Sequence, residues 1–334
     1  MGSGFMGSGF VFASPQVPTL PQGPTLPGPP SGVAALSSPS HPWATFHLDP
    51  VACGLIGIAA AGYAYGLLRL AGQGESWPVR RSVVFFGSGL LSLLLFTMAW
   101  PGAYAHALFS AYIVQVLGLF MITPVLLACG RPVELVRSVA SDRSRRIGGR
   151  LTRVRLLRGA VSPIFGALLV PVITSVVVFT GISGASLRSE PLYHALQVAL
   201  LALGFLVAVP LIEGSAQVTG IAAAAALFIS FLELLLDSLP GGVLTFRTHL
   251  LVPVQYLVLH RSWGPSPLTD QHTAGAILWG VGEVADLPFI AVLMVRWMRV
   301  DEREAREADR LLDEAEGGAT LMRPWWETDP RPPR

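Results

Sequence analysis

The chain has 334 residues, of which 52% are hydrophobic and only 13% charged, whereas about a quarter of a soluble domain is charged. This composition excludes an ordinary soluble globular protein and indicates several membrane-spanning segments. The net charge of +2 gives no reason to expect a nucleic-acid partner, because the arginines flank the apolar stretches. Cys53 and Cys129 fall near opposite ends of different predicted spans, so no disulfide is expected.

The first 42 residues form a Gly-, Pro- and Ser-rich segment without a charged side chain. Such a segment buries too little apolar surface to offset its ordering entropy, so we expect a disordered tail. It has no basic stretch followed by a continuous apolar core, so no secretory signal peptide is expected. The predicted organisation is a tail over 1–42, a transmembrane domain over 43–300 and a charged cytoplasmic tail over 301–334.

A spanning helix requires about 20 mostly apolar residues. Val51–Ala71 supplies the first, and the 49 uncharged residues of Ser82–Gly130 allow two crossings with a turn at Pro101-Gly102. The remaining predicted spans are Ala160–Gly181, Leu192–Ile212, Ser215–Leu236 and His272–Trp297. The predicted fold is therefore an all-α polytopic membrane bundle of about seven transmembrane helices. Residues 243–259 could form a further short or interfacial helix.

Arginine placement predicts the orientation of these spans. Arg80 and Arg81 follow span 1, nine arginines lie from Arg131 to Arg158, and eight lie from Arg296 to the C-terminus. These regions all fall on one side, which predicts an N-terminus outside and a cytoplasmic C-terminus. All seven histidines then fall at the outer face, namely His41, His47, His106, His194, His249, His260 and His272.

A group of histidines on one side of a bilayer favours metal or proton handling there, because neutral imidazole is the commonest metal ligand. The alternative is that polar residues simply accumulate at membrane interfaces. Soft ligands for Cu(I) exist in Met98, Met121 and Cys53, but without a repeated metal-binding spacing.

Polar residues also occur within the predicted spans. Glu233 lies in span 6, Glu283 and Asp286 lie in span 7, and Gln115 lies in span 3. Intramembrane acids are costly and mark either a functional pathway or a structural hydrogen bond. Gln115 is expected to bond between helices. No nucleophile elbow, phosphate-binding loop, HExxH helix or paired CxxC occurs, so an enzyme is not expected.

Several stretches carry motif-like sequences, in the order Trp77-Pro78 with Arg80-Arg81, Phe109–Val116, Thr123–Leu127 followed by Gly130–Val133, Asp270-Gln271 with Gly275 and Trp279, and Trp297–Arg299 with Asp301–Ala305. In order and spacing they resemble the multi-span CtaG-like family of cytochrome c oxidase assembly factors, found in bacteria with caa-type oxidases. The resemblance covers residues 43–310. It implies a multi-pass protein of the bacterial plasma membrane that assists copper insertion into a haem-copper oxidase or stabilises one of its subunits.

The departures from the family pattern concern its paired histidines. Two histidines four residues apart share a helix face and could share a metal. Tyr112 and Val116 stand where the third span usually has such a pair, and Val198 replaces the partner of His194 in the fifth. The metal ligands that remain as candidates are His194, His106 and His272, with Gln115 and Glu283 orienting or gating the site and Asp270 opening the last span.

Three interpretations of function follow. The first is an oxidase assembly factor that handles copper, with the lipid bilayer and haem-copper oxidase subunits as partners. The second is a metal-free scaffold paralogue, since valine cannot bind a metal ion. The third is a small-solute or proton transporter that uses Glu233, Glu283 and Asp286.

Overall fold

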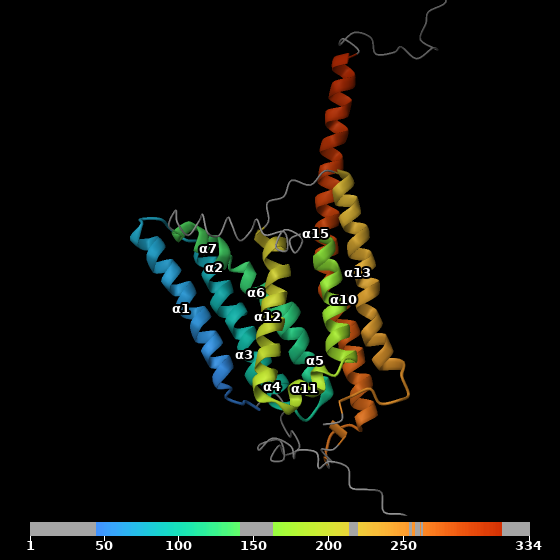
Figure 1. Cartoon of the computed structure of the whole chain (residues 1–334). Helices are drawn as coiled ribbons and strands as arrows, with labels where there is room; N and C mark the ends of the chain where they lie inside the picture. Colours follow the sequence, from blue (N-terminus) through green and yellow to red (C-terminus); the bar gives the residue numbers. More distant parts are fainter. Residues whose placement is uncertain are drawn as a thin grey trace, which may run out of the picture.

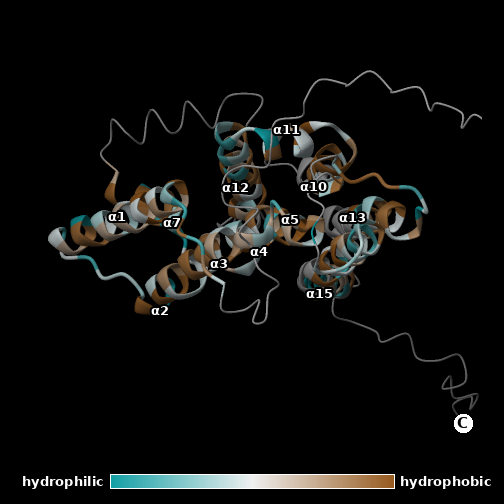
Figure 2. Cartoon of the chain, turned by 90° about the horizontal axis from the view of Figure 1, so that it is seen from below, coloured by the Kyte–Doolittle hydropathy of each residue, from teal (hydrophilic) through white to brown (hydrophobic). Residues whose placement is uncertain are grey.

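The computed structural model describes residues 45–140, 163–213, 220–253, 256–257, 261 and 263–315. The regular structure of these residues is entirely helical, as the sequence predicted. The helices lie side by side in a bundle (Figure 1), and hydrophobic residues predominate along them (Figure 2). The predicted tail over 1–42 lies outside the described residues.

The first half of the described chain contains three rods and two short end helices. These are α1 (Pro50–Gly72), then α2 (Val79–Val83), η3 (Val84–Leu90) and α3 (Leu91–Met98), the short α4 (Trp100–Tyr104), then α5 (Phe109–Leu117), η4 (Gly118–Ile122) and α6 (Thr123–Cys129), and the short α7 (Pro132–Val139). The π-helical segments η3 and η4 were not predicted. The expected turn at Pro101-Gly102 is itself a helical turn, α4.

The second half comprises α10 (Pro163–Phe179), α11 (Ile182–Arg188), α12 (Glu190–Glu213), α13 (Gly220–Phe246) and α15 (Pro267–Ala315). Residues 247–253, after α13, are not helical, so the described part of 243–259 is not one continuous helix. The last helix runs without a break into the charged segment, where residues 301–312 are exposed.

Among the described residues, four helices are long and apolar enough to cross a membrane: Pro50–Gly72, Val79–Tyr104, Phe109–Cys129 and Glu190–Pro210. A fifth crossing is formed if Leu169–Phe179 and Ile182–Arg188, which meet at a 60° bend, make one span. The described part of the sixth predicted span, from Gly220 on, belongs to α13, and the seventh predicted span lies within α15. Helix α13 packs against both α10 and α15. Seven spans and the orientation of the termini stay predictions.

The bundle has two polar ends. The end that carries α4, α11 and the first turns of α1, α12 and α15 is called the α4 end here, and the opposite end is called the α7 end (Figure 1). The described histidines all belong to segments of the α4 end, which is the predicted outer face: His47, His106, His194, His249 and His272. His41 and His260 lie outside the described residues.

Glycines allow the helices to approach closely. A Cβ atom at Gly241 of α13 would lie 2.6 Å from the backbone nitrogen of Trp279 in α15, and one at Gly275 would lie 2.6 Å from that of Thr245. Similarly, a Cβ at Gly204 of α12 would lie 2.0 Å from the carbonyl oxygen of Phe120 in η4. Small residues at helix interfaces permit this backbone contact in membrane bundles.

Candidate functional site at the α4 end

Asp49 fixes the start of α1. Its Oδ1 atom accepts hydrogen bonds from the backbone nitrogens of Val51 at 2.8 Å and Ala52 at 3.1 Å, and Pro50 occupies the first helical position. Asp before Pro is a favoured beginning of a helix, because the carboxylate satisfies free amide groups and proline has none to lose. The second carboxylate oxygen, Oδ2, remains available and faces α12.

His194 lies on the first turn of α12 between two carboxylates. Its Nδ1 atom is 3.6 Å from Asp49 Oδ2 and 3.5 Å from Gln197 Oε1, and its Nε2 atom is 3.5 Å from Glu190 Oε2. The His194 side chain is 21% exposed, that of Glu190 is 63% exposed and Asp49 is buried. The imidazole therefore joins the buried start of α1 to the accessible start of α12.

His106, between α4 and α5, belongs to the same group. Its ring lies 4.6 Å from that of Tyr193, and the Tyr193 ring lies 5.6 Å from that of His194. Burial lowers the pKa of His106 by more than the nearby Glu190 carboxylate raises it, and the imidazoles of His47 and His194 lower it further. This shift favours the neutral imidazole, which is the form that retains a free nitrogen lone pair.

Gln115 connects the polar residues around His194 to the centre of the bundle. These residues are called the α4-end group here: Asp49, His106, Glu190, Tyr193, His194 and Gln197. The Tyr193 hydroxyl donates to Gln115 Oε1 at 2.6 Å, and Gln115 Nε2 donates to the carbonyl oxygen of Phe96 at 3.2 Å. Gln115 therefore bonds α5 to both α12 and α3, as expected of a glutamine within a span.

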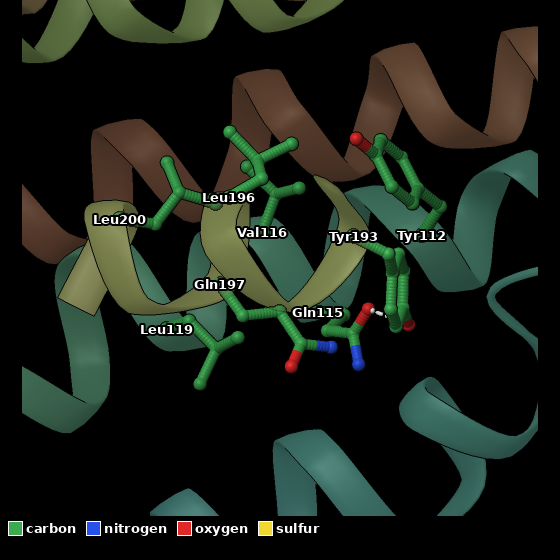
Figure 3. A pocket seen from close by; sticks show the side chains of 8 residues that line it. All are labelled: Tyr112, Gln115, Val116, Leu119, Tyr193, Leu196, Gln197 and Leu200. Atoms are coloured by element: carbon green, nitrogen blue, oxygen red, sulfur yellow. Dashed lines mark hydrogen bonds between the residues drawn. The ribbon is translucent and has the colours of Figure 1, made fainter. Parts of the chain in front are cut away.

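A small cavity between α5 and α12 lies beside this connection (Figure 3). It is lined by Tyr112, Gln115, Val116, Leu119, Tyr193, Leu196, Gln197 and Leu200, and it has room for about one water molecule. The hydroxyl of Tyr112, one of the lining residues, lies 3.3 Å from that of Ser186 in α11. The two positions that replace the histidine pair of the third span thus face the Tyr193 and Gln197 side of α12.

His194 and Val198, the positions of the corresponding pair on α12, do not face this cavity. Val198 is 41% exposed and lies outside the lining, and His194 points to Asp49 and Glu190. The four positions that the resemblance associates with paired histidines therefore do not converge in this chain.

His272 contacts a different part of the molecule from His106 and His194. Its Nε2 atom is 3.0 Å from the carbonyl oxygen of Arg247, in the connection that follows α13. The structure brings His106 and His194 together around Tyr193 and places His272 on the first turns of α15. Within the described segments, no group of three or more His, Cys, Asp and Glu side chains has a metal-binding arrangement.

Asp270 and Gln271, at the start of α15, accept hydrogen bonds from backbone N–H groups of neighbouring segments. Asp270 is buried and accepts from the backbone nitrogen of Phe109 at 2.7 Å and from the hydroxyl of Ser110 at 2.5 Å, which caps α5. Arg261 Nη2 lies 3.5 Å from the same carboxylate. Gln271 Oε1 accepts from the backbone nitrogen of Leu251 at 2.6 Å. Both side chains therefore organise the loops of the α4 end.

The intramembrane acids are placed apart from this group. Glu283 is exposed on α15 and accepts a hydrogen bond from Trp279 Nε1, one turn earlier. Glu233 is half-buried on α13. Asp286 lies within α15, and its side chain is outside the described part.

Sequence reasoning missed several members of the α4-end group, notably Asp49, Glu190, Tyr193 and Gln197. Two local signals were present. Asp49-Pro50 has the form of a helix start, and Glu190 and His194 are four residues apart at the beginning of an apolar helix, so they share a face. The approach of Asp49 to His194 is a tertiary contact without a local signal.

The α7 end contains a second polar network. Glu134 pairs with Arg81 at 2.9 Å and with Arg131 at 2.7 Å, and the Arg81 guanidinium carbon lies 4.8 Å from the ring centre of Trp77. Trp77 Nε1 donates to the hydroxyl of Tyr63 at 3.0 Å, and Tyr63 donates to the carbonyl oxygen of Gly130 at 2.9 Å. The tryptophan-arginine motif before span 2 and the Gly-Arg-Pro motif after span 3 thus meet in one network.

The model of the cytochrome c oxidase caa3 assembly factor family matches residues 61–300. The chain belongs to this family. The match begins within α1 and ends within α15, and it includes the motifs of both polar ends. This membership agrees with the resemblance noted from its motifs, and the described helices include several that are long and apolar enough to cross a membrane.

The chain is also similar to uncharacterised mycobacterial proteins. It is 27% identical over 264 residues to proteins of Mycobacterium bovis and Mycobacterium tuberculosis, and 26% identical over 264 residues to a protein of Mycobacterium leprae. Each alignment covers 77% of this chain and 40% of the relative, so the chain spans less than half the length of these proteins. No solved structure matches significantly.

Proposed function

We propose that this protein assists the maturation of a haem-copper oxidase in the bacterial plasma membrane by handling copper at its α4 end. His194 and His106 are the cargo ligands in this proposal. Membership of the family supports a role in oxidase assembly. Copper handling must be supported by the residues of this chain.

One observation carries the proposal. His106 and His194 come from separate segments of the chain, yet both pack against the Tyr193 ring, at 4.6 and 5.6 Å between ring centres. Imidazole is a suitable ligand for copper. The acidic side chains of Asp49 and Glu190 beside His194 also favour the approach of a cation.

A metal-free scaffold is the second candidate. The observation that favours it is the closed core between α5 and α12, where Tyr112 and Val116 stand in place of the family's histidines and the cavity has room for about one water molecule. A scaffold would recognise an oxidase subunit through its helix surfaces and would need no ligand at the α4 end. A transporter is less favoured, because Glu283 bonds to Trp279 on the exposed face of its own helix.

The decisive experiment compares oxidase copper in cells that lack the gene and carry either the wild-type chain, His194→Ala or His106→Ala. Copper handling predicts that both variants accumulate normally in the membrane but leave the oxidase with reduced copper, as the deletion does. His249→Ala, which changes an exposed histidine of the same end, is the matched control and should restore full copper content. Normal oxidase copper with both ligand variants would favour the scaffold.

A further inference from the structure

The exposed end of α15, residues 301–315, extends beyond the α7 end of the bundle (Figure 1) and is acidic. It contains seven carboxylate side chains and three arginines, which gives a net charge of −4. Its described side chains, residues 301–312 and 314, are all exposed. Two of the arginines are paired within the helix, Arg306 with Glu302 and Arg310 with Glu314. The surplus of negative charge attracts a basic partner.

The charged and apolar residues of this end are sorted onto different faces of the helix. The three arginines share one face, because they recur at spacings of three and four residues. The opposite face carries an apolar stripe made of Ala305, Ala308 and Leu312, and Leu312 is 62% exposed. Glu304 and Asp309 border this stripe. Such a face is complementary to a segment that carries both apolar and basic side chains.

The same chain contains a segment of this character. Residues 141–158, which lie outside the described part of the chain, contain seven arginines and one acid and have a net charge of +6. Leu151, Val154 and Leu157 recur every three residues among these arginines. A second copy of α15 is a poorer partner, because two helix ends with a net charge of −4 repel each other.

We propose that residues 141–158 dock on the exposed end of α15. The arginines of the segment contact the acids that border the apolar stripe, and its leucines and valine cover the stripe itself. The contact joins the connection between α7 and α10 to the end of the last helix. It goes beyond the proposed copper function and does not depend on it.

The course of the chain permits this contact. Helix α7 ends at Val139 and α10 begins at Pro163, both at the α7 end, and α15 leaves the bundle at the same end (Figure 1). The 22 residues from 141 to 162 can extend over about 70 Å, at roughly 3.3 Å per residue. The exposed end of α15 rises by only about 22 Å, at about 1.5 Å per residue. The segment is therefore long enough to follow this end and return to α10.

The absence of lysine from the chain provides a direct test. Arg153→Lys introduces a single side-chain amine, which a carbodiimide joins without a spacer to a carboxylate in contact with it. Mass spectrometry of the full chain in neutral phosphatidylcholine nanodiscs then locates the link. We expect an intrachain link to Glu304, Glu307 or Asp309. Arg80→Lys, at an exposed arginine of α2 at the same end, is the matched control and should give no link to residues 301–315.

Salt and loss of the acids should both weaken the contact. The screening length falls from about 10 Å at 0.1 M salt to about 3 Å at 1 M, so we expect the yield of the link to fall at least fivefold. Without the lysine substitution, the double variant Glu307→Gln with Asp309→Asn should speed tryptic cleavage within residues 141–158 at least threefold. Glu75→Gln, at an exposed acid between α1 and α2, is the matched control and should leave the cleavage rate unchanged.

Two results would overturn the proposal. Links that form only between isotopically distinct chains would show that the exposed end of α15 binds a second copy of the protein. The absence of a link, together with a cleavage rate that the double variant does not change, would show that residues 141–158 do not dock on α15. Protection of these residues by vesicles that contain phosphatidylglycerol would then identify an anionic lipid surface as their partner.

Discussion

The polar network of the α7 end differs from the surroundings of His194 at the α4 end in how closely the polar groups approach one another. At the α7 end, Glu134 lies 2.7–2.9 Å from two guanidinium groups, and Trp77 donates to Tyr63 at 3.0 Å. At the α4 end, His194 lies 3.5–3.6 Å from three separate oxygen atoms. The groups of the α7 end are within hydrogen-bonding distance and satisfy one another, whereas the contacts of His194 are longer than a good hydrogen bond.

The comparison separates the family's motifs by role. The motifs of the α7 end join α1, α2 and α7 through direct contacts. The α4 end contains both kinds of arrangement, because Asp270 caps α5 at 2.5–3.3 Å while His194 faces its neighbours at longer distances. We therefore expect the loss of stability caused by a substitution to depend on how short the contacts of that residue are, and not on the motif to which the residue belongs.

The largest effect is expected from Asp270→Ala. This change removes the cap of α5 and leaves the buried Arg261 guanidinium without its carboxylate. Loss of one partner of a buried ion pair costs about 3–5 kcal/mol. Thermal unfolding of the purified protein should show a large fall in midpoint. A fall as small as that of an exposed substitution such as Glu302→Gln would refute the structural role of the Asp270 motif.

Next in size is Gly130→Ala at the α7 end. A Cβ at this position would lie 2.7 Å from the Cβ of Phe85 and 3.2 Å from the carbonyl oxygen of Arg81, so η3 must shift. Overpacking of this kind costs about 1–3 kcal/mol. Gly72→Ala is the matched control, because nothing lies within 4 Å of a Cβ there. Equal unfolding midpoints for the two variants would show that the α7 end is looser than its contacts indicate.

A smaller effect is expected from Tyr63→Phe, which removes one oxygen atom from the α7 end. The Gly130 carbonyl oxygen then loses its donor and Trp77 Nε1 loses its acceptor. An unsatisfied buried polar group costs about 1–3 kcal/mol, and the lower part of that range applies here because Trp77 is only half-buried. Chemical denaturation should show the loss. A stability equal to that of the wild type would mean that water replaces the hydroxyl.

The smallest effect on stability is expected from protonation of Glu134, which forms ion pairs with Arg81 and Arg131. The Arg131 guanidinium, followed by that of Arg81, holds the pKa of this carboxyl below its ordinary value of 4.5. The contribution of the Glu134 carboxylate to the free energy of unfolding is therefore present above about pH 4.5, and it is lost as pH falls through the lower pKa of the folded state. Because Glu134 is 40% exposed, solvent screening limits the contribution to less than about 1 kcal/mol.

A comparison of unfolding midpoints at pH 7 and pH 3.5, for the wild type and Glu134→Gln, isolates this contribution. The wild type should lose slightly more stability than the variant on acidification, and added salt should reduce the difference. A variant that loses more stability than the wild type would contradict the direction of the pKa shift.

Much of the fold followed from the sequence because it depends on local properties. The apolar run of Ser82–Gly130 and the Pro-Gly pair within it predicted two crossings, and the distribution of arginines and histidines assigned a polar character to each end. The π-helical segments η3 and η4 had no such signal, since they depend on how neighbouring helices pack.

The candidate site was predictable only in part. The position of His194 at the start of its span was visible, but the rotation of α12 about its axis was not, and that rotation separates His194 from the Tyr112 and Val116 face of α5. A spacing of four residues identifies a shared helix face without saying what the face meets. The Asp270 cap joins residues 161 positions apart, a contact that no local pattern predicts.

One dimension of α15 has a mechanical consequence. At about 1.5 Å per residue, its 49 residues span roughly 70 Å, more than twice the roughly 30 Å hydrocarbon thickness of a bilayer. Its first turn is fastened to the cap of α5 through Asp270, while its far end is exposed. A tilt of about 5° at that first turn moves Ala315 by roughly 6 Å, so this helix is a lever that amplifies small movements of the α4 end at its exposed far end.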